Sequence, residues 1–425
     1  MASAPKSIPQ SGPLSPEADQ AAALAAFGGV LTVDLDAIIA NWRKLEKTAV
    51  PAECSAVIKA DAYGCGAEQV SRALSKAGCK TFFVATIEEA RKVRAAVPEP
   101  TIYVLGGYFQ NTGEHYAKIN CRPVIGDLNE LAEWDVFCRR TGWNGGAAVH
   151  IDTGMNRLGL TLSEAQAIIP RINAGDHGIT LVMSHLVSAE QLNSPINARQ
   201  LATFRSIASE FTGVPAALAN SSGIFLGAPF QFDLVRPGAA LYGVNPTPEA
   251  DNPMQQVVDL KARIVQIRSI ERGETVGYGG TWTARRPTKL AIIAVGYADG
   301  YFRAASSNDG TRGADVIVAG KRCPVAGRIS MDLIAIDITD LPPNAVRRGH
   351  MVTLLGEGIT VDELAHHFGT IGYEVLTSLG RRYARVYKDG NVEEPLTKPE
   401  PASNAGQPPS PPSIEQPSAL PPLPS

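Results

Sequence analysis

Basic side chains stand where several short apolar runs of this chain end. Lys59, Arg157, His185 and Arg236 each lie at or just beyond the end of such a run, with few acidic residues beside them. A group of this composition favours an anionic ligand. A lysine that is buried near other cations also has a lowered pKa, so its neutral amine can attack a carbonyl group. These residues predict amine chemistry on an anionic ligand.

Lys59 taken alone has two interpretations. It follows Ala56, Val57 and Ile58, in a run that should form a buried strand. Most lysines at a strand end extend their charged group to solvent. A lysine at the mouth of a barrel is instead suited to carry an aldehyde cofactor. The position alone does not separate the two interpretations.

The elements that position these residues follow a regular alternation. Apolar runs, most of them followed by an amphipathic helical stretch, occupy residues 54–59, 81–86, 101–106, 121–126, 147–153, 178–186, 215–221 and 232–238. Eight β/α units predict an α/β fold with an N-terminal (β/α)8 TIM-like barrel, whose functional side chains gather at the carboxyl ends of the strands. A doubly wound open sheet is the alternative, because periodicity does not exclude it.

The pattern changes after the barrel. Strand-like runs separated by glycine- and proline-containing turns predict a mainly β C-terminal domain, in which only 361–368 reads as a helix. We expect the barrel over 28–245 and the β domain over 246–393. Residues 1–27 and the proline-rich 394–425 are expected to be disordered tails. A helix that follows 30–34 is expected to have Asp36 as its N-cap.

Composition narrows the function classes. The formal net charge is -3 and the isoelectric point about 6.2, which argues against a nucleic-acid partner. No secretory leader and no membrane-spanning run is visible, so we expect a cytoplasmic protein without a membrane partner. The six cysteines are scattered, which is typical of reduced thiols. No Cys, His and carboxylate spacing indicates a metal site.

A series of motifs resembles the alanine racemases, a family that depends on pyridoxal 5'-phosphate. The resemblance covers about residues 29–390 and is carried in order by AVIKADAYGCG (56–66), HIDTGMNRLG (150–159), MSHL (183–186), ANSSG (219–223), VRPGAALYG (235–243), VGYGGTW (276–282), AVGYADGY (294–301), GRISMD (327–332) and GYEV (372–375). It implies that Lys59 carries the cofactor. It also implies cofactor-binding roles for Tyr63, His185, Asn220, Ser221, Arg236, Gly238, Ala239 and Tyr373.

The predicted phosphate site agrees with the barrel. Barrels often bind phosphate at the loops after strands seven and eight, where Ser221 and Gly238 fall. The alternative for Ser221 is an ordinary helix cap. Arg236 matches the family's arginine that faces the pyridine nitrogen. A guanidinium does not release its proton, so the ring stays a weak electron sink, which favours racemisation. The alternative for Arg236 is a salt bridge at the rim.

The resemblance also implies a two-base mechanism. Lys59 would serve one face of the substrate's Cα and Tyr278 the other, with His185 linking Tyr278 to Arg236. The implied substrate-binding residues are Arg157, Met331 and Tyr297, supported from behind by His150 and Asp332. In this family the partner's β domain completes each site, which implies a homodimer. His150 departs from the pattern, because many members have a carbamylated lysine there.

The function expected from the resemblance is interconversion of L- and D-alanine, an isomerase activity that supplies D-alanine for peptidoglycan. Three alternatives remain open. The first is a racemase of the same fold with a broader substrate range, such as serine or lysine. The second is a pyridoxal-phosphate-binding protein without turnover, although such proteins resemble the barrel alone. The third is an amino-acid decarboxylase, which Arg236 opposes.

Overall fold

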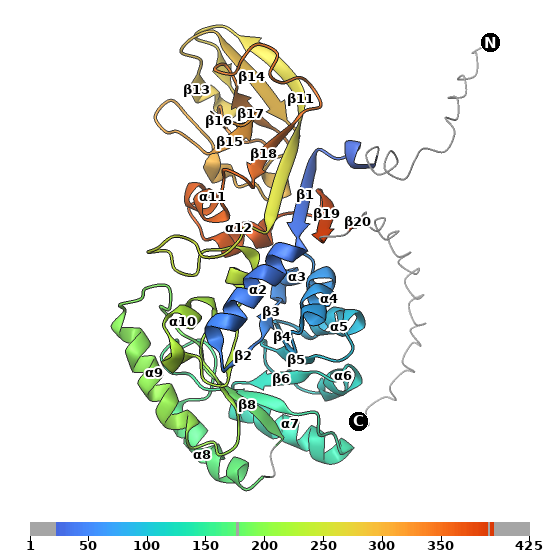
Figure 1. Ribbon diagram of the computed structural model, residues 1–425, viewed down its shortest axis with the longest axis vertical. Helices are drawn as coiled ribbons and strands as arrows, with labels where there is room; N and C mark the ends of the chain where they lie inside the picture. The colour runs from blue at the N-terminus through green and yellow to red at the C-terminus, as the bar shows by residue number, and fades with distance from the viewer. Residues whose placement is uncertain (1–22, 176–177, 390–391, 395–425) are drawn as a thin grey trace, which may run out of the picture.

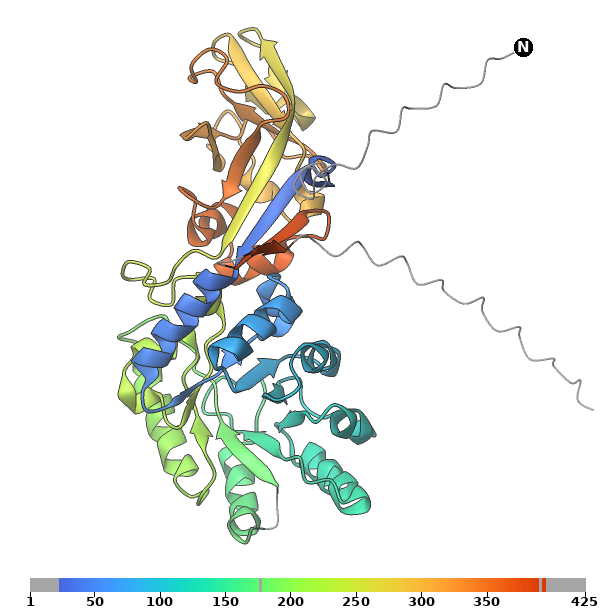
Figure 2. The ribbon, with the colours of Figure 1, turned by 45° about the vertical axis from the view of Figure 1, so that its right-hand side comes forward.

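Two units follow one another along the long axis of the molecule (Figure 1). The computed structural model describes residues 23–175, 178–389 and 392–394. One end of the molecule is a ring of parallel strands surrounded by helices, and the other is a twisted, mainly antiparallel sheet, as the turned view also shows (Figure 2). Of the expected tails, residues 1–22 and 395–425 lie outside the described residues.

The ring of strands is a closed barrel. Its strands are β2 (Glu53–Cys54), β3 (Ala56–Val57), β4 (Thr81–Val84), β5 (Thr101–Val104), β6 (Arg122–Ile125), β7 (Ala147–His150), β8 (Ile179–Met183), β9 (Ala216–Ala217) and β10 (Leu234–Val235). Strands β3 to β9 pair in parallel in sequence order. Only Ser55 separates β2 from β3, and β2 pairs in parallel with β10. A bridge between Asn220 and Arg236 joins the end of β9 to β10. This closure confirms the barrel and excludes the open sheet.

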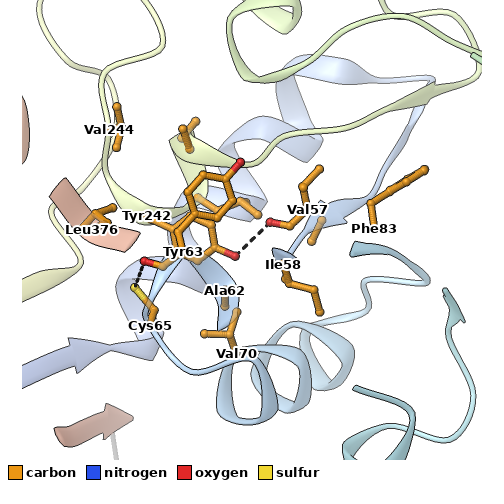
Figure 3. Packing of buried hydrophobic residues seen from close by; sticks show 14 of the residues in the cluster. Val57, Ile58, Ala62, Tyr63, Cys65, Val70, Phe83, Tyr242, Val244 and Leu376 are labelled. Carbon is orange, nitrogen blue, oxygen red and sulfur yellow. Dashed lines mark hydrogen bonds between the residues drawn. The ribbon is translucent and has the colours of Figure 1, made fainter. Parts of the chain in front are cut away.

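Helices cover the outside of the barrel. They are α2 (Leu35–Ala49), α4 (Ala67–Ala77), α5 (Ile87–Ala96), α6 (Gly113–Lys118), α7 (Leu128–Thr141), α8 (Leu162–Asn173), α9 (Pro195–Ala208) and α10 (Ser221–Phe225). Because parallel strands in a barrel are buried on both faces, they read as continuous apolar runs. Figure 3 shows the core beside β3, where the rings of Tyr63 and Tyr242 stack at a centroid distance of 4.7 Å. Phe83 and Leu376 lie in the same core cluster.

The β domain contains one strand that precedes the barrel in the sequence. Strand β1 (Gly29–Asp34) pairs antiparallel with β11 (Val258–Ile270) and parallel with β19 (Ala384–Asp389). Strand β1 therefore lies in the second sheet, although its residues fall within 28–245, the range that the sequence predicts for the barrel. The remaining strands of this domain are β12 (Thr275–Val276), β13 (Trp282–Thr283), β14 (Thr288–Ile293), β15 (Asp315–Val318), β16 (Lys321–Pro324), β17 (Ile334–Asp337), β18 (Met351–Leu355) and β20 (Val392–Glu394).

Three sequence expectations at these boundaries were wrong. Helix α11 (Val361–Phe368) is present as predicted, but α12 (Gly372–Ser378) is a second helix of the β domain, too short for its periodicity to be recognised. Residues 23–27, expected to be part of a disordered tail, carry a helical turn, and Arg263 donates hydrogen bonds to the carbonyls of Leu24 and Phe27. The N-cap of α2 is Asp34 and not Asp36, because the extended backbone that a cap needs is found at the end of β1.

Two further properties concern the whole described chain. All six cysteines are free thiols, and five of them are buried. Within residues 23–175, 178–389 and 392–394, no helix combines the length and the apolar character that crossing a membrane requires.

The corrected cap leads to a stability prediction. The carboxylate of Asp34 accepts a hydrogen bond from the Ala37 N–H at 2.8 Å. We expect Asp34→Ala to lower the free energy of unfolding by about 1 kcal/mol. Its exposed ion pair with Lys388, at 3.4 Å, adds little. The matched control is Asp36→Ala, an exposed position in the first turn, with an expected change within about 0.5 kcal/mol. The free energy of unfolding of both variants is measured by urea unfolding. An equal decrease in the two variants would contradict the assignment of Asp34 as the N-cap.

Candidate active site

Lys59 opens a backbone segment of unusual conformation at the mouth of the barrel. Helix α3 (Lys59–Tyr63) follows β3 directly, and α12 of the β domain packs against it. The four residues Ala60 to Tyr63 have φ angles of 53°, 54°, 53° and 55°, in the left-handed region. This conformation costs L-residues about 1–2 kcal/mol each, so it persists only where neighbouring contacts enforce it. The direction of the Lys59 side chain therefore depends on those contacts.

Contacts from both domains hold the left-handed turn. The Ala62 N–H donates to the Ile58 carbonyl at 3.0 Å, and the Gly66 N–H donates to the Asp61 carbonyl at 2.8 Å. At Gly64, with φ of 80°, an added Cβ would lie 2.5 Å from the Leu376 carbonyl oxygen of α12. Only glycine fits at that position, since it combines a left-handed backbone with close backbone approach.

Positive charge dominates the surroundings of Lys59. Burial, the Arg157 guanidinium and, more weakly, the Arg236 guanidinium lower the pKa of Lys59, while the Glu89 carboxylate acts in the opposite direction. Both burial and like charges disfavour the ammonium form. Both arginines that the sequence predicts at this rim act electrostatically on Lys59. A lysine in such a place is prepared to act as a neutral amine.

Arg236 is the most buried cation of the group, with 4% of its surface exposed. Its Nη2 donates to the carbonyl oxygens of Ser184 and, at 3.2 Å, Leu218. Its guanidinium carbon lies 6.0 Å from the centroid of the Phe83 ring, the outer limit of a cation–π contact. Burial lowers the pKa of Arg236 to about 10, so the group stays charged at neutral pH. Within the described chain, its buried Nε–H has no hydrogen-bond partner.

Two histidines, His150 and His185, lie close enough to the arginines to be affected by their charge. Burial, Arg236 and Arg157 lower the pKa of His150 to about 4. The same causes, with further contributions from His150 and Lys59, hold the pKa of His185 well below its ordinary value. Both imidazoles are therefore neutral at pH 7, and neither adds to the positive charge around Lys59.

The loops after β9 and β10 form a separate pocket wall. The Ser221 hydroxyl accepts hydrogen bonds from the N–H groups of Gly238, at 3.0 Å, and Ala240, at 3.2 Å. The role expected for Ala239, in binding the cofactor phosphate, stays a prediction. Asn220 caps α10 through the Gly223 N–H at 2.9 Å. The cap that the sequence analysis considered for Ser221 is thus supplied by Asn220.

Tyrosines border this wall. A Cβ added at Gly238 would lie 2.4 Å from the Tyr63 hydroxyl, so the missing side chain makes room for that group. The ring of Tyr373 in α12 lies edge-on to Tyr63 at a centroid distance of 6.2 Å. Burial raises the pKa of Tyr373 to about 12, so its hydroxyl keeps its proton and can donate it in a hydrogen bond.

Arg157 lies on a loop that one carboxylate organises. Asp152 accepts hydrogen bonds from the N–H groups of Gly154, Met155 and Asn156 at 2.9, 2.8 and 2.9 Å. A comparable role falls to the buried Gln200, which donates to the Thr153 hydroxyl at 3.1 Å and the His185 carbonyl at 2.9 Å. Gln200 could not be predicted from the sequence, because a buried amide on an amphipathic helix leaves no signal in the pattern.

The structure does not bring every predicted site residue to Lys59. Tyr278 and Tyr297 open short 3₁₀ turns of the β domain. The carbonyl of Met331 accepts a hydrogen bond from the N–H of Ala298, the residue after Tyr297, at 3.0 Å. The side chains of Tyr278, Tyr297 and Met331 are 68%, 42% and 52% exposed. Figure 1 places β13, next to Tyr278, at the end of the molecule remote from the barrel. Asp332 is paired with Arg382 at 2.8 Å and does not face Lys59.

Comparison with known proteins covers both units. Residues 33–246 match the family model of the alanine racemase N-terminal domain, and residues 257–387 match that of the C-terminal domain. The alanine racemase of Methylobacterium nodulans is 51% identical over 369 residues, which cover 87% of this chain and 98% of that protein. The biosynthetic alanine racemase of Agrobacterium fabrum is 43% identical and covers 84% of this chain and 93% of its own length.

A solved structure agrees with these sequence matches. The crystal structure of alanine racemase from Bartonella henselae, with covalently bound pyridoxal phosphate, superimposes with a TM-score of 0.80 at 39% identity. The superposition covers 85% of this chain and 99% of that one. Both the barrel and the β domain are therefore matched.

The surroundings of Lys59 lead to a prediction about its reactivity. In folded protein freed of bound cofactor, Lys59 should be acylated with a midpoint below the ordinary lysine pKa of about 10.4, because burial and two guanidinium groups disfavour its charged form. Labelling across a pH series, read out by peptide mass spectrometry, measures the midpoint. The same peptide in urea-unfolded protein is the control, and identical midpoints in the two states would contradict the site geometry.

Proposed function

The chain belongs to the alanine racemase family, isomerases that act on an amino acid with pyridoxal 5'-phosphate, and on that premise we propose that it interconverts L- and D-alanine with Lys59 and Tyr278 as the two bases. The observation that carries the proposal is a half-buried lysine at the barrel mouth, whose pKa is lowered by burial and by two guanidinium groups. A family match over both domains supports it.

The side chains around Lys59 fit pyridoxal phosphate. Among the buried polar atoms that have no partner within the described residues are the Nε of Arg236 and the hydroxyl of Ser222. Gly238 leaves open the space in front of the Tyr63 hydroxyl. When bound, the cofactor supplies an electron sink that acidifies the Cα–H of the substrate. We assign it to Lys59 for attachment and to Ser221, Gly238, Tyr63 and Tyr373 for the phosphate. Neighbouring positions Asn220, Ala239 and His185 shape the same pocket.

Arg236 controls the electron demand at the site. We assign its unpartnered Nε–H to the cofactor ring, to which it would donate a hydrogen bond. Its pKa, about 10 after burial, leaves the proton on the guanidinium at neutral pH. Arg236 would therefore donate a hydrogen bond to the cofactor without protonating it, and the electron sink that the cofactor supplies would stay weak. A weak sink favours prompt return of a proton to Cα over competing reactions, and a decarboxylase is disfavoured on the same ground.

The two bases act on opposite faces of the substrate. Lys59 is suited to move a proton, because burial and the nearby guanidinium groups lower its pKa and so favour the neutral amine. Tyr278 is too far from the barrel mouth of its own subunit, so we assign it to the site of a partner. Arg157 is placed to bind the substrate carboxylate, a pairing that suits a guanidinium fork. The neutral His150 occupies the space beside Arg157 without contributing charge.

The exposed apolar side chains support a head-to-tail homodimer. One group surrounds the barrel mouth and contains Leu158, Val187 and Ile371. The other lies on the β domain and contains Tyr278, Tyr297, Met331 and Leu333. Burying both groups together would remove from water the apolar surface that a monomer leaves exposed. Tyr297 and Met331 would then line the substrate end of the partner's site.

A small substrate follows from the same residues. Tyr297 and Tyr373 are large and leave space for a short side chain only, which favours alanine over lysine. The proposed role is to supply D-alanine for peptidoglycan, in the cytoplasm.

Incubation with L-alanine in deuterated water tests the activity, and we expect exchange at Cα together with formation of D-alanine. Cα exchange or D-alanine formation at no more than the uncatalysed rate would contradict the proposal. Measuring the activity on a panel of amino acids distinguishes an alanine racemase from a racemase of broader substrate range.

The partner assignment leads to a complementation prediction. Lys59→Ala and Tyr278→Phe should each lose most racemase activity as separate proteins. A mixed dimer would combine the intact Tyr278 of the first variant with the intact Lys59 of the second in one of its two sites. Re-associating equal amounts of the two variants should therefore restore about a quarter of the wild-type activity.

The outcome distinguishes the two arrangements of the site. If Tyr278 acted within its own subunit, each variant would carry a complete defect, and mixing would restore nothing. The control is each variant mixed with itself under the same conditions. Size measurement of the re-associated sample confirms that dimers have exchanged subunits.

A further inference from the structure

Glu89 connects the Lys59 turn to the neighbouring β/α unit. Its Oε1 accepts a hydrogen bond from the Ala60 N–H at 2.7 Å, and its Oε2 accepts one from the Ala85 N–H at 2.7 Å. Oε2 also lies 3.3 Å from the Thr86 N–H. Ala60 is the residue immediately after Lys59, whereas Ala85 and Thr86 link β4 to α5. A single carboxylate therefore joins two successive barrel loops at the position of the lysine.

The bond to Ala60 lies at the point where the backbone enters its left-handed conformation. Ala60 is the first of four consecutive non-glycine residues with positive φ. Such a conformation needs external contacts to be maintained. A hydrogen bond from a backbone N–H to a carboxylate is among the stronger contacts available, since the acceptor is charged. Glu89 thus constrains the peptide plane that follows Lys59.

Glu89 also acts on the charge of Lys59. The groups that influence the Lys59 amine are Arg157 and Arg236, which disfavour its charged form, and Glu89, which favours it. His185 faces the same space but is neutral. Glu89 is thus the carboxylate that offsets two guanidinium groups.

We propose that Glu89 is a positioning residue for Lys59, which holds the backbone of the left-handed turn so that the amine points into the barrel mouth. The proposal rests on the proposed function, in which Lys59 carries the cofactor and moves a proton. It goes beyond that function by assigning the orientation of Lys59 to a side chain that does not contact the reacting groups.

A purely structural role for Glu89 is the competing explanation. Glu89 belongs to a capping box at the start of α5, in which the Thr86 hydroxyl accepts the Glu89 N–H at 3.3 Å. If Glu89 only stabilised this helix, loss of the other half of the box would have the same effect on Lys59. Thr86→Ala weakens the cap and leaves the bond between Glu89 and Ala60, so it is the matched control. Glu88→Gln, an exposed neighbour paired with Arg91, controls for loss of a charge.

The test uses Glu89→Gln in full-length protein. Glutamine has one acceptor oxygen, so it cannot serve the Ala60 and Ala85 N–H groups together, and it carries no charge. In cofactor-free protein we expect the midpoint of Lys59 acylation to move to lower pH than in wild type. In the loaded enzyme we expect kcat to fall on the order of 10- to 100-fold, the usual effect of a displaced reacting group, with little change in KM. Thr86→Ala and Glu88→Gln should keep the wild-type midpoint and kcat.

Each result decides the proposal. A folded Glu89→Gln variant with the wild-type midpoint and kcat would overturn it, as would an equal change in Thr86→Ala. If Glu89→Gln does not fold, Glu89→Asp keeps the charge but has a shorter reach, and a wild-type kcat in that variant would overturn the proposal. Failure of the wild-type protein to racemise alanine would instead contradict the proposed function, while the acylation midpoints would still test Glu89.

Discussion

Repulsion between Lys59, Arg157 and Arg236 is the interaction on which the site depends. Three cationic groups near one another in a partly buried space disfavour one another's charged forms. Burial and the two guanidinium groups together lower the pKa of the Lys59 amine. Burial of both histidines in neutral form means that neither takes up charge in its place. An anionic cofactor and an anionic substrate would relieve the remaining excess of positive charge, which makes this arrangement a binding site as well as a reactive one.

The barrel fold determines which strands carry the cationic side chains and how close these strands lie. Arg236 reaches the site from β10 and Lys59 from β3, and closure of the barrel between β2 and β10 makes these strands neighbours. The left-handed turn then decides where the amine points. That turn is held from the barrel side by Glu89 and from the β-domain side by α12. The β domain therefore supports the lysine of its own subunit, while its exposed tyrosines are proposed to complete the site of the partner.

Sequence reasoning recovered the features that a local pattern encodes. The eight predicted apolar runs correspond to the barrel strands, with β2 and β3 together matching the first run. The basic residues at the strand ends were recognised because strand ends are read directly from the pattern. The family resemblance, now supported by matches to both domain models, supplied the cofactor and the isomerase class. The capping residue of α2 was misplaced by two positions, since Asp34 and Asp36 have the same side chain and only the backbone distinguishes them.

Other features could not be predicted because they depend on contacts between distant segments. Nothing in the residues Gly29–Asp34 indicates that they pair with β11 and β19 rather than with the barrel. The left-handed turn is not encoded by glycine, since Ala60, Asp61 and Ala62 all adopt positive φ. Glu89 reads as an ordinary helix-capping residue until its bond to Ala60 is seen.

Reductive trapping on the native protein tests the central claim most directly. Treatment with borohydride should fix the pyridoxyl group covalently to one lysine, and peptide mapping identifies that lysine. We predict a single modified peptide that contains Lys59, with loss of activity in proportion to its yield. Modification of a different lysine, or no pyridoxyl group on any peptide, would contradict the account.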